Sequence, residues 1–477
     1  MVDSWLKLYV FAMTPPALNP SHLLNHLEAI LDSDPHIDEL GFIHPSQFAA
    51  LNEELHSSSE PVFLLPAEIS KSNPVRDTSS HTFFWHNEHK LGISTLFLVP
   101  LYNAAKDAFM DAYKQYSMLH GSQVKKDETL DVNSLNSSAS FVDIVETQVM
   151  KHSRALVLLS CDFGTAWNSR KLIVSKKLVF SVLMDELRLS ALVLSCSPKS
   201  ERAWSHRRWV IKMMAGNFSN LQEIVERESE LVKTLAESSK MNYRAWNHRC
   251  WLVSYMSDSQ VLLELQCSRD WAAVHVADNS CFHYRARLLL QMIENLRHNN
   301  EQGGLSGAEF HQVWKEELDW VGTLIRRYVG REALWLHRRF LSLVWLKHLA
   351  NDDQSISCHY CCRSSEICDI STFVEVELML LSSCTTIPDN EFGDYQAQAT
   401  YSAAYIMWLA KQMPMSFGVE FQRSPQYEML KPLVSNIGKS CLWDSMTASC
   451  TRSSCIPSYG SMSLNQYISL VDWLCRQ

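Results

Sequence analysis

Residues 198–209 read Pro-Lys-Ser-Glu-Arg-Ala-Trp-Ser-His-Arg-Arg-Trp, and residues 241–251 read Met-Asn-Tyr-Arg-Ala-Trp-Asn-His-Arg-Cys-Trp. Both runs contain Ala-Trp, one variable residue and His-Arg, with a further Trp two positions after the Arg. Two such copies indicate an internal repeat. A repeat of this length determines the architecture of the whole region, because each copy is one supersecondary unit.

The core of the repeat is an aromatic residue followed three positions later by Arg. It occurs at Trp167 and Arg170, Trp204 and Arg207, Trp246 and Arg249, and Trp335 and Arg338, with a weaker copy at Phe282 and Arg285. With 15 Trp and 43 Lys+Arg in 477 residues, chance predicts about one Trp-x-x-Lys/Arg. A Glu-Leu pair is a second landmark, beginning 18 residues before the aromatic at Glu186, Glu264 and Glu317, and 16 before it at Glu230.

These landmarks predict a helical hairpin as the unit. The Glu suits the start of a first helix, and Trp and Arg at i and i+3 share one face of a second. The Arg can lie over an aromatic ring or fork onto a carboxylate. A single hairpin cannot cover its apolar face, so neighbours must stack. The sequence therefore predicts an all-α fold, an α-solenoid of about five hairpins, in which the motif residues are structural.

The solenoid is expected to cover residues 140–350. Residues 1–139 are predicted to be a partly helical extension, with a helix at 21–31 capped by Ser21, another helix after Pro100, and a loop at 121–140. Residues 351–477 are predicted to be a second irregular extension, with helices at 375–383 and 395–413.

Cysteines crowd one short segment, from Cys358 to Cys368. Their Cys-x-x-Cys spacing is compatible with zinc, but structural zinc sites draw ligand pairs from separate turns. We interpret the segment as a flexible cysteine-containing loop and expect no metal on this chain.

Composition excludes several classes of protein. The net charge of −9 offers no general basic field, so nucleic acid is not an expected partner. No run approaches the length of about 20 apolar residues that a transmembrane helix needs. The 14 Cys, without a secretory leader, favour a reducing compartment. We expect a cytoplasmic protein.

The units resemble the repeats of protein prenyltransferase α-subunits, whose pattern is approximately Asn-Tyr-x-x-Trp-x-x-Arg. The resemblance covers residues 140–350 and extends loosely to 34–41 and 87–92. It implies a heterodimer in which a separate β-subunit holds the zinc and the isoprenoid, while the α-solenoid contributes residues at the seam. Zinc would activate the acceptor cysteine, and cationic side chains would stabilise the departing diphosphate.

The resemblance assigns catalytic contacts to three residues. Lys199 holds the family position that reaches the isoprenoid diphosphate, and Tyr243 and Arg244 hold positions near the diphosphate and the peptide. The plainer alternatives are a solvated lysine near a helix cap and a packing tyrosine. Arg202 falls where the family contacts the acceptor peptide. The chain departs from the pattern at Ser200-Glu201, and Glu201 must face away from a diphosphate or pair with a neighbour such as Arg202.

Two functions remain open. The first is the α-type subunit of a protein prenyltransferase of the geranylgeranyl type, inactive alone, with a β-subunit, an acceptor protein and an isoprenoid diphosphate as partners. The second is a helical scaffold that binds proteins without prenyl chemistry, which would need only the Trp and Arg of each repeat. A stand-alone enzyme is disfavoured, because the sequence contains no phosphate-binding glycine loop or nucleophile elbow.

Overall fold

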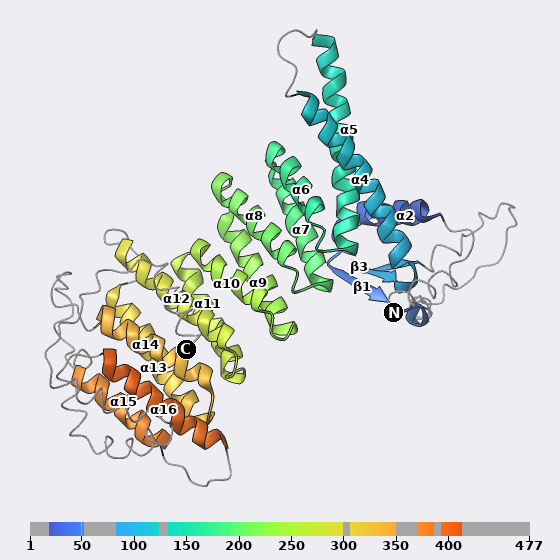
Figure 1. Ribbon diagram of the computed structural model, residues 1–477. Helices are drawn as coiled ribbons and strands as arrows, with labels where there is room; N and C mark the ends of the chain where they lie inside the picture. Colours follow the sequence, from blue (N-terminus) through green and yellow to red (C-terminus); the bar gives the residue numbers. More distant parts are fainter. Residues whose placement is uncertain are drawn as a thin grey trace, which may run out of the picture. The chain divides into compact units, whose positions relative to one another are not determined.

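The computed structural model describes residues 19–48, 50–51, 83–123, 132–298, 306–349, 370–385 and 393–412. The chain divides into two compact units, residues 1–248 and 249–477. Both are built mainly from α-helical hairpins (Figure 1), which confirms the predicted all-α repeat fold. In the described ranges, no helix is both long and apolar enough to cross a lipid bilayer.

The helices follow the predicted hairpins closely. The first three hairpins are α5 (Val132–Leu159) with α6 (Gly164–Lys177), α7 (Phe180–Cys196) with α8 (Glu201–Asn217), and α9 (Leu221–Ser238) with α10 (Tyr243–Leu252) and the 3₁₀ turn η3 (Val253–Tyr255). The next two are α11 (Asp258–Val274) with α12 (Asn279–His298), and α13 (Gly307–Arg327) with α14 (Glu332–Val344) and the π-helical turn η4 (Trp345–Leu349). We call the two helices of a hairpin helix A and helix B.

The repeat aromatics form the hairpin cores. Trp204 is fully buried, and Trp167, Trp246, Phe282 and Trp335 are each at most 3% exposed. The indole Nε1 of Trp167 donates to the Cys161 carbonyl at 2.8 Å, and that of Trp204 donates to the Pro198 carbonyl at 3.0 Å. These two indole rings are therefore buried without leaving their one polar atom unsatisfied.

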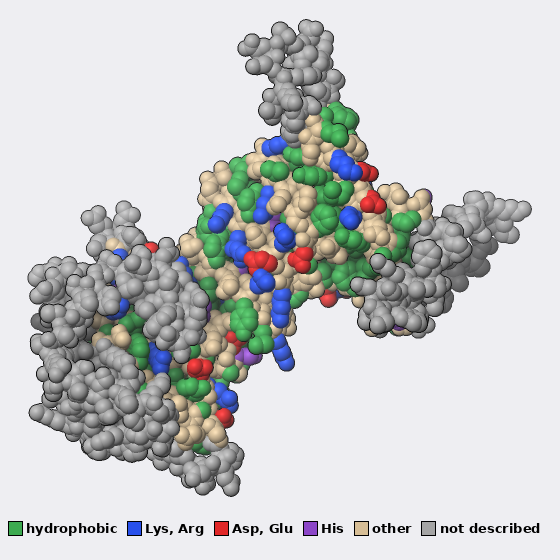
Figure 2. Space-filling view, in the orientation of Figure 1, with side chains coloured by type: hydrophobic (Ala, Val, Ile, Leu, Met, Phe, Trp, Pro, Cys, Tyr) green, Lys and Arg blue, Asp and Glu red, His purple; other side chains and the backbone are tan. Residues whose placement is uncertain are grey.

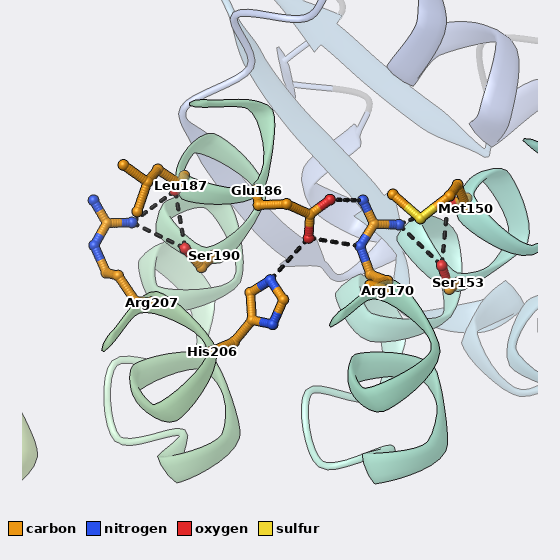
Figure 3. Close-up of polar contacts among 8 residues, drawn as sticks. All are labelled: Met150, Ser153, Arg170, Glu186, Leu187, Ser190, His206 and Arg207. Atoms are coloured by element: carbon orange, nitrogen blue, oxygen red, sulfur yellow. Dashed lines mark hydrogen bonds and ion pairs between the residues drawn. The ribbon is translucent and has the colours of Figure 1, made fainter. Parts of the chain in front are cut away.

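A buried glutamate joins each hairpin to the one before it. At the first junction, the Arg170 guanidinium of α6 forks onto the Glu186 carboxylate of α7, with Nε donating at 3.0 Å (Figure 3). His206, on helix B of the glutamate's own hairpin, contacts the same carboxylate through Nε2 at 2.8 Å. Arg170 Nη1 also donates to the Met150 carbonyl at 2.6 Å on helix A of its own hairpin. One arginine thus connects three helices.

A similar arrangement recurs at every described junction, and each junction lies within one unit. At the third junction the glutamate, Glu264, is 17% exposed, and Arg249 Nη2 donates to it at 2.9 Å. The motif arginine, the glutamate and the histidine or tyrosine that contacts the same carboxylate are Arg207, Glu228 and His248; Arg249, Glu264 and Tyr284; Arg285, Glu317 and His337; and Arg338, Glu377 and Tyr405. Of the two roles that the sequence allowed for the arginines, forking onto a carboxylate is the general one. Arg249 and Arg285 also lie over aromatic rings, with guanidinium-to-centroid distances of 4.4 and 4.7 Å.

The charges of each junction balance. Burial alone would raise the pKa of Glu186, but the positive charge of Arg170 and the hydrogen bonds from His206 and Arg170 outweigh it and lower the pKa to about 2. Burial lowers the pKa of His206. The carboxylate and the guanidinium are therefore charged, and the histidine is a neutral donor.

One landmark of the sequence analysis is wrong. The glutamate of the third hairpin is Glu228, 18 residues before Trp246, and not Glu230 of the Glu-Leu pair. Glu228 is 2% exposed and binds Arg207, whereas Glu230 is exposed and pairs with Lys233 at 3.6 Å. The interval of 18 residues is thus constant in the second to fifth hairpins, where it sets which helix A residue faces the preceding arginine.

The stack continues beyond residue 350. Helices α15 (Ile370–Thr385) and α16 (Gly393–Gln412), predicted only as parts of an extension, form a sixth hairpin. Glu377 of α15 accepts from Arg338, and Tyr405 of α16 donates to Glu377 at 2.8 Å. Position 406, where an arginine would follow, is the buried Ile406. The segment Cys358–Cys368 and residues 413–477 lie outside the described residues.

The N-terminal extension contains a small sheet that the sequence analysis did not predict. Strands β1 (Glu39–Ile43), β2 (Phe84–Asn87) and β3 (Lys90–Ser94) lie in the order β1-β3-β2, with β1 parallel and β2 antiparallel to β3. Glu88 and His89 adopt positive φ, which closes a two-residue hairpin between β2 and β3. These strands are short, and they lack the regular alternation of apolar and polar residues from which a strand is usually recognised in a sequence.

Two helical expectations in this extension also need correction. Helix α2 (Pro20–Ser33) is capped by Asn19, whose side chain accepts from the Ser21 amide, and not by Ser21. Helix α4 (Leu98–Gln123) begins before Pro100, and α5 begins at Val132, so much of the predicted loop at 121–140 is helical. The extension packs on the first hairpins, where His152 of α5 contacts Glu28 of α2 at 2.7 Å and Ser195 of α7 accepts from the Leu40 amide at 3.1 Å.

Replacing Glu228 by Ala should destabilise the protein strongly, because Arg207 would remain buried without a counter-charge. We expect a loss of about 3–5 kcal/mol in the free energy of unfolding, measured by urea denaturation. The matched control is Glu230→Ala, on the exposed side of the same helix, which should change the free energy by less than about 0.5 kcal/mol. Equal losses in the two variants would contradict the assignment of Glu228.

Stability should fall as the solution becomes acidic. Burial lowers the pKa of His206, His248 and His337, so below about pH 6.5 the unfolded chain binds protons that the folded chain does not. Each such proton contributes up to about 1.4 kcal/mol of destabilisation per pH unit. A second loss, from the glutamates, should follow between about pH 4.5 and pH 2. The free energy of unfolding at about pH 7.5 and pH 5.5 tests this expectation, and His206→Gln should shrink the difference. Greater stability at the lower pH would refute it.

Candidate anion-binding site

The candidate site residues lie where α8 and α10 begin, and one carbonyl joins these two helix starts. The Pro198 carbonyl accepts from Trp204 Nε1 at 3.0 Å and from Asn242 Nδ2 at 2.9 Å. Because Lys199 follows Pro198 and Tyr243 follows Asn242, the structure brings both residues to the same edge of unit 1.

Asn242 holds the start of α10 in place. Its side chain is 1% exposed, and its Oδ1 accepts from the Ala245 amide at 3.1 Å as an N-cap. In the preceding hairpin, Ser200 is the N-cap of α8, accepting from the Ala203 amide at 3.3 Å. Ser200 stands where the family pattern has Asn, and it keeps the N-cap of α8. Unlike Asn242, however, Ser200 has no side-chain amide that could donate to a carbonyl of the preceding hairpin.

The side chains assigned to chemistry are accessible. Lys199, Arg202, Tyr243 and Arg244 are all exposed, with Tyr243 58% exposed. Tyr243 therefore does not fill a core, which removes the packing alternative. Nothing buries Lys199 either, so its position is compatible both with contact to an anion and with a solvated lysine near a cap.

Glu201 pairs with two arginines, and neither is the neighbour that the sequence analysis suggested. Its carboxylate accepts from Arg244, on α10, and from Arg208 Nη2 at 3.1 Å, about two helical turns further along α8. Arg202 points elsewhere. A Cβ added to Gly164, at the start of α6, would lie 2.5 Å from Arg202 Nη1, so the guanidinium occupies the space that a glycine leaves there.

The structure adds two cations that the sequence analysis missed. Lys171 of α6 and Arg208 of α8 each follow the repeat tryptophan by four residues, and Lys171 Nζ lies over the Trp209 ring at 5.9 Å. Burial and the neighbouring charge of Arg208 lower the pKa of Lys171, and burial lowers that of Arg208. Because Lys171 and Arg208 occupy the same position in successive repeats, the repeat alignment of the sequence could have identified both cations.

The result is a surface with an excess of positive charge. Figure 2 shows lysine and arginine side chains gathered over α6 and α8. The group consists of Lys171, Lys199, Arg202, Arg208 and Arg244, with Glu201 as the acid paired within it. Such a group can hold a polyanion with several donors, and Arg208 and Arg244 can exchange the carboxylate for phosphate oxygens.

The described residues provide no group of three or more His, Cys, Asp and Glu side chains that could hold a metal ion. The exposed cations of this surface can bind and orient an anion and can stabilise negative charge as it develops.

Comparison with known proteins identifies the family of the repeats. The model of the protein prenyltransferase alpha subunit repeat matches residues 183–214, 225–256 and 314–343. These ranges coincide with the second, third and fifth hairpins, so the resemblance predicted from the Trp and Arg spacing is confirmed. The chain contains protein prenyltransferase alpha subunit repeats.

Several proteins named protein prenyltransferase alpha subunit repeat-containing protein 1 are similar to this chain. The Homo sapiens protein is 30% identical over 247 residues, which are 42% of this chain and 60% of the relative. The Danio rerio protein is 29% identical over 246 residues, 43% of this chain and 55% of the relative. The 1-B form of Xenopus laevis is 30% identical over 226 residues, 39% and 52% of the two chains. The matches thus span little more than half the length of these relatives.

Removing the charge of Glu201 should strengthen anion binding. Glu201→Gln leaves Arg208 and Arg244 without a competing carboxylate, and one unit charge near 4 Å in water is worth about 1 kcal/mol, or about fivefold in affinity. Titration calorimetry with inorganic diphosphate measures the effect. Glu223→Gln, an exposed glutamate on α9 paired with Arg227, is the matched control and should leave the affinity unchanged. An equal gain in both variants would indicate only a general charge effect.

Proposed function

We propose that this chain, which carries protein prenyltransferase alpha subunit repeats, is the α-type subunit of a heterodimeric protein prenyltransferase. The reaction is the transfer of an isoprenoid, of the geranylgeranyl type, from its diphosphate to a protein cysteine. The β-subunit holds the zinc and the isoprenoid, and the complex is cytoplasmic. The repeats matched in this chain support the family, and the substrates and the partner are our proposal.

One observation carries the proposal. The hydrogen bonds of the Pro198 carbonyl bring Lys199 and the Tyr243–Arg244 pair to one edge, although the chain separates them by 44 residues. Packing of the hairpins does not require any of these three side chains, since all are exposed. A scaffold would need the buried Trp, Arg and Glu of each repeat but not this exposed trio.

The residues have separate tasks in this proposal. Lys199 and Arg244 donate to the diphosphate and balance the charge that grows as the bond to the isoprenoid carbon breaks. Tyr243 donates a hydrogen bond without adding charge. Arg202 is the candidate contact to the acceptor peptide. Zinc on the partner supplies the thiolate nucleophile. Because Arg202 and Glu201 replace the usual neighbours, an acceptor ending in Cys-a-a-X is not assumed.

The ion pairs of Glu201 favour a second candidate, a helical scaffold that binds protein partners. A carboxylate that neutralises Arg244 and Arg208 weakens the field that a diphosphate needs. Copurification with prenyltransferase β-subunits, followed by a transfer assay with labelled geranylgeranyl diphosphate, separates the two functions. We expect activity from the dimer and none from the chain alone. Assembly without transfer to any acceptor protein would favour the scaffold.

Lys199→Ala should slow transfer without preventing assembly. Loss of one cationic contact to a developing oxyanion costs on the order of 10²-fold in rate, measured in single-turnover assays of the purified dimer. Trp204→Ala is the structural counterpart and should cost about 3–5 kcal/mol of stability. Unchanged turnover and unchanged isoprenoid affinity in an assembled Lys199→Ala dimer would show that the lysine is only solvated.

A further inference from the structure

Helix B of the first two hairpins carries cations and accessible apolar side chains on one face. The residues four and five positions after the repeat tryptophan are Lys171 and Leu172 in α6, and Arg208 and Trp209 in α8. Leu172 is 54% exposed, and Trp209 is partly exposed. The two helices bring these residues together, since Lys171 Nζ lies 5.9 Å from the centre of the Trp209 ring. We call these four residues and the exposed Lys212, one turn further along α8, the helix B face.

Acidic residues are almost absent from these two helices. Helix α6 contains four Lys and Arg residues and no Asp or Glu, and α8 contains four with Glu201 as its only acid. Helix A of the next hairpin, α9, has the opposite balance, with five Glu against two Lys and Arg. The whole chain has a net charge of −9, so the positive charge of the helix B face is a local feature.

The cations of the helix B face are only partly neutralised. Arg208 pairs with Glu201 at 3.1 Å. No ion pair joins Lys171 or Lys212 to any residue that the structure describes. Burial and the neighbouring charge of Arg208 lower the pKa of Lys171. The Lys171 ammonium is therefore held beside a second cation without a carboxylate of its own, which is a position that an acidic ligand would stabilise.

The apolar members of the face select the kind of acidic ligand. Cations alone bind a phosphate backbone, and an aliphatic side chain such as Leu172 contributes nothing to that contact. A lipid surface requires a broad apolar helix face that enters the acyl boundary, whereas here one exposed leucine lies beside one partly exposed tryptophan. A protein segment can supply both an apolar side chain and carboxylates, and tryptophan and arginine are enriched among the residues that dominate interface affinity.

We propose that the helix B face of α6 and α8 is a docking surface for an acidic segment of a partner protein. An apolar side chain of this segment packs on Leu172 and Trp209, and a carboxylate on either side of it accepts from Lys171 and from Lys212. The face shares Lys171 and Arg208 with the candidate anion site. Docking does not require prenyl transfer, so the proposal goes beyond the proposed function and does not rest on it.

The test measures binding of labelled synthetic peptides to the full chain by fluorescence anisotropy. One peptide contains Leu flanked by Glu, the second has Gln in place of each Glu, and the third has Ser in place of each Leu. We expect only the first to bind, with an affinity that falls as salt is raised. Leu172→Ser should weaken its binding by at least about tenfold.

A charge reversal gives the second arm of the test. Lys171→Glu combined with Lys212→Glu should abolish binding of the Glu peptide and create binding of a peptide with Lys in place of each Glu. The matched controls are Leu263→Ser, at a leucine 55% exposed on α11, and the pair Lys106→Glu and Lys114→Glu on α4. The controls should retain the affinity, and the unfolding midpoint of every variant should stay close to that of the wild type.

Three results would overturn the proposal. The first is equal binding of all three peptides, or no binding of the Glu peptide. The second is binding of phosphatidylserine vesicles or of a single-stranded oligonucleotide that Leu172→Ser weakens as strongly as peptide binding, which would identify a membrane or a nucleic acid as the ligand. The third is loss of peptide binding in Lys199→Ala but not in Leu172→Ser, which would place the carboxylates at the candidate anion site.

Discussion

The fold depends on a buried glutamate that accepts simultaneously from the arginine of the preceding hairpin and from a histidine or tyrosine of its own. Removing either charge would strand the other in an apolar surrounding, which costs several kcal/mol. The contact is directional, since the glutamate lies on helix A and the arginine on helix B. Hairpins linked in this way can stack in only one order and one register.

The sixth hairpin departs from the pattern of the others. Tyr405 still satisfies Glu377, but the buried Ile406 takes the place of an arginine. A charged residue there would need a further glutamate, and among the described residues none follows on a next hairpin. Tyr284 and Tyr405 also show that the donor need not be titratable. The histidines at Glu186, Glu228 and Glu317 therefore add a sensitivity to acid that the tyrosines do not.

The junctions also explain why charge is available at the surface. Each buried junction is neutral in total, so the exposed cations at the starts of α8 and α10 are not needed to balance the interior. Lys199 and Arg244 are available to bind an anion because Glu186 and Glu228 already neutralise the motif arginines Arg170 and Arg207.

The sequence by itself determined the repeat, the hairpins and their burial, because Trp and Arg three residues apart mark one helix face wherever the chain folds. It also singled out Lys199, Tyr243 and Arg244. Only the tertiary structure decided which glutamate pairs with which arginine, since Glu228 and Glu230 differ only in the face they present. The partners of Glu201, the mixed sheet at residues 39–94 and the sixth hairpin likewise depend on contacts between residues far apart in the chain, which no local pattern encodes.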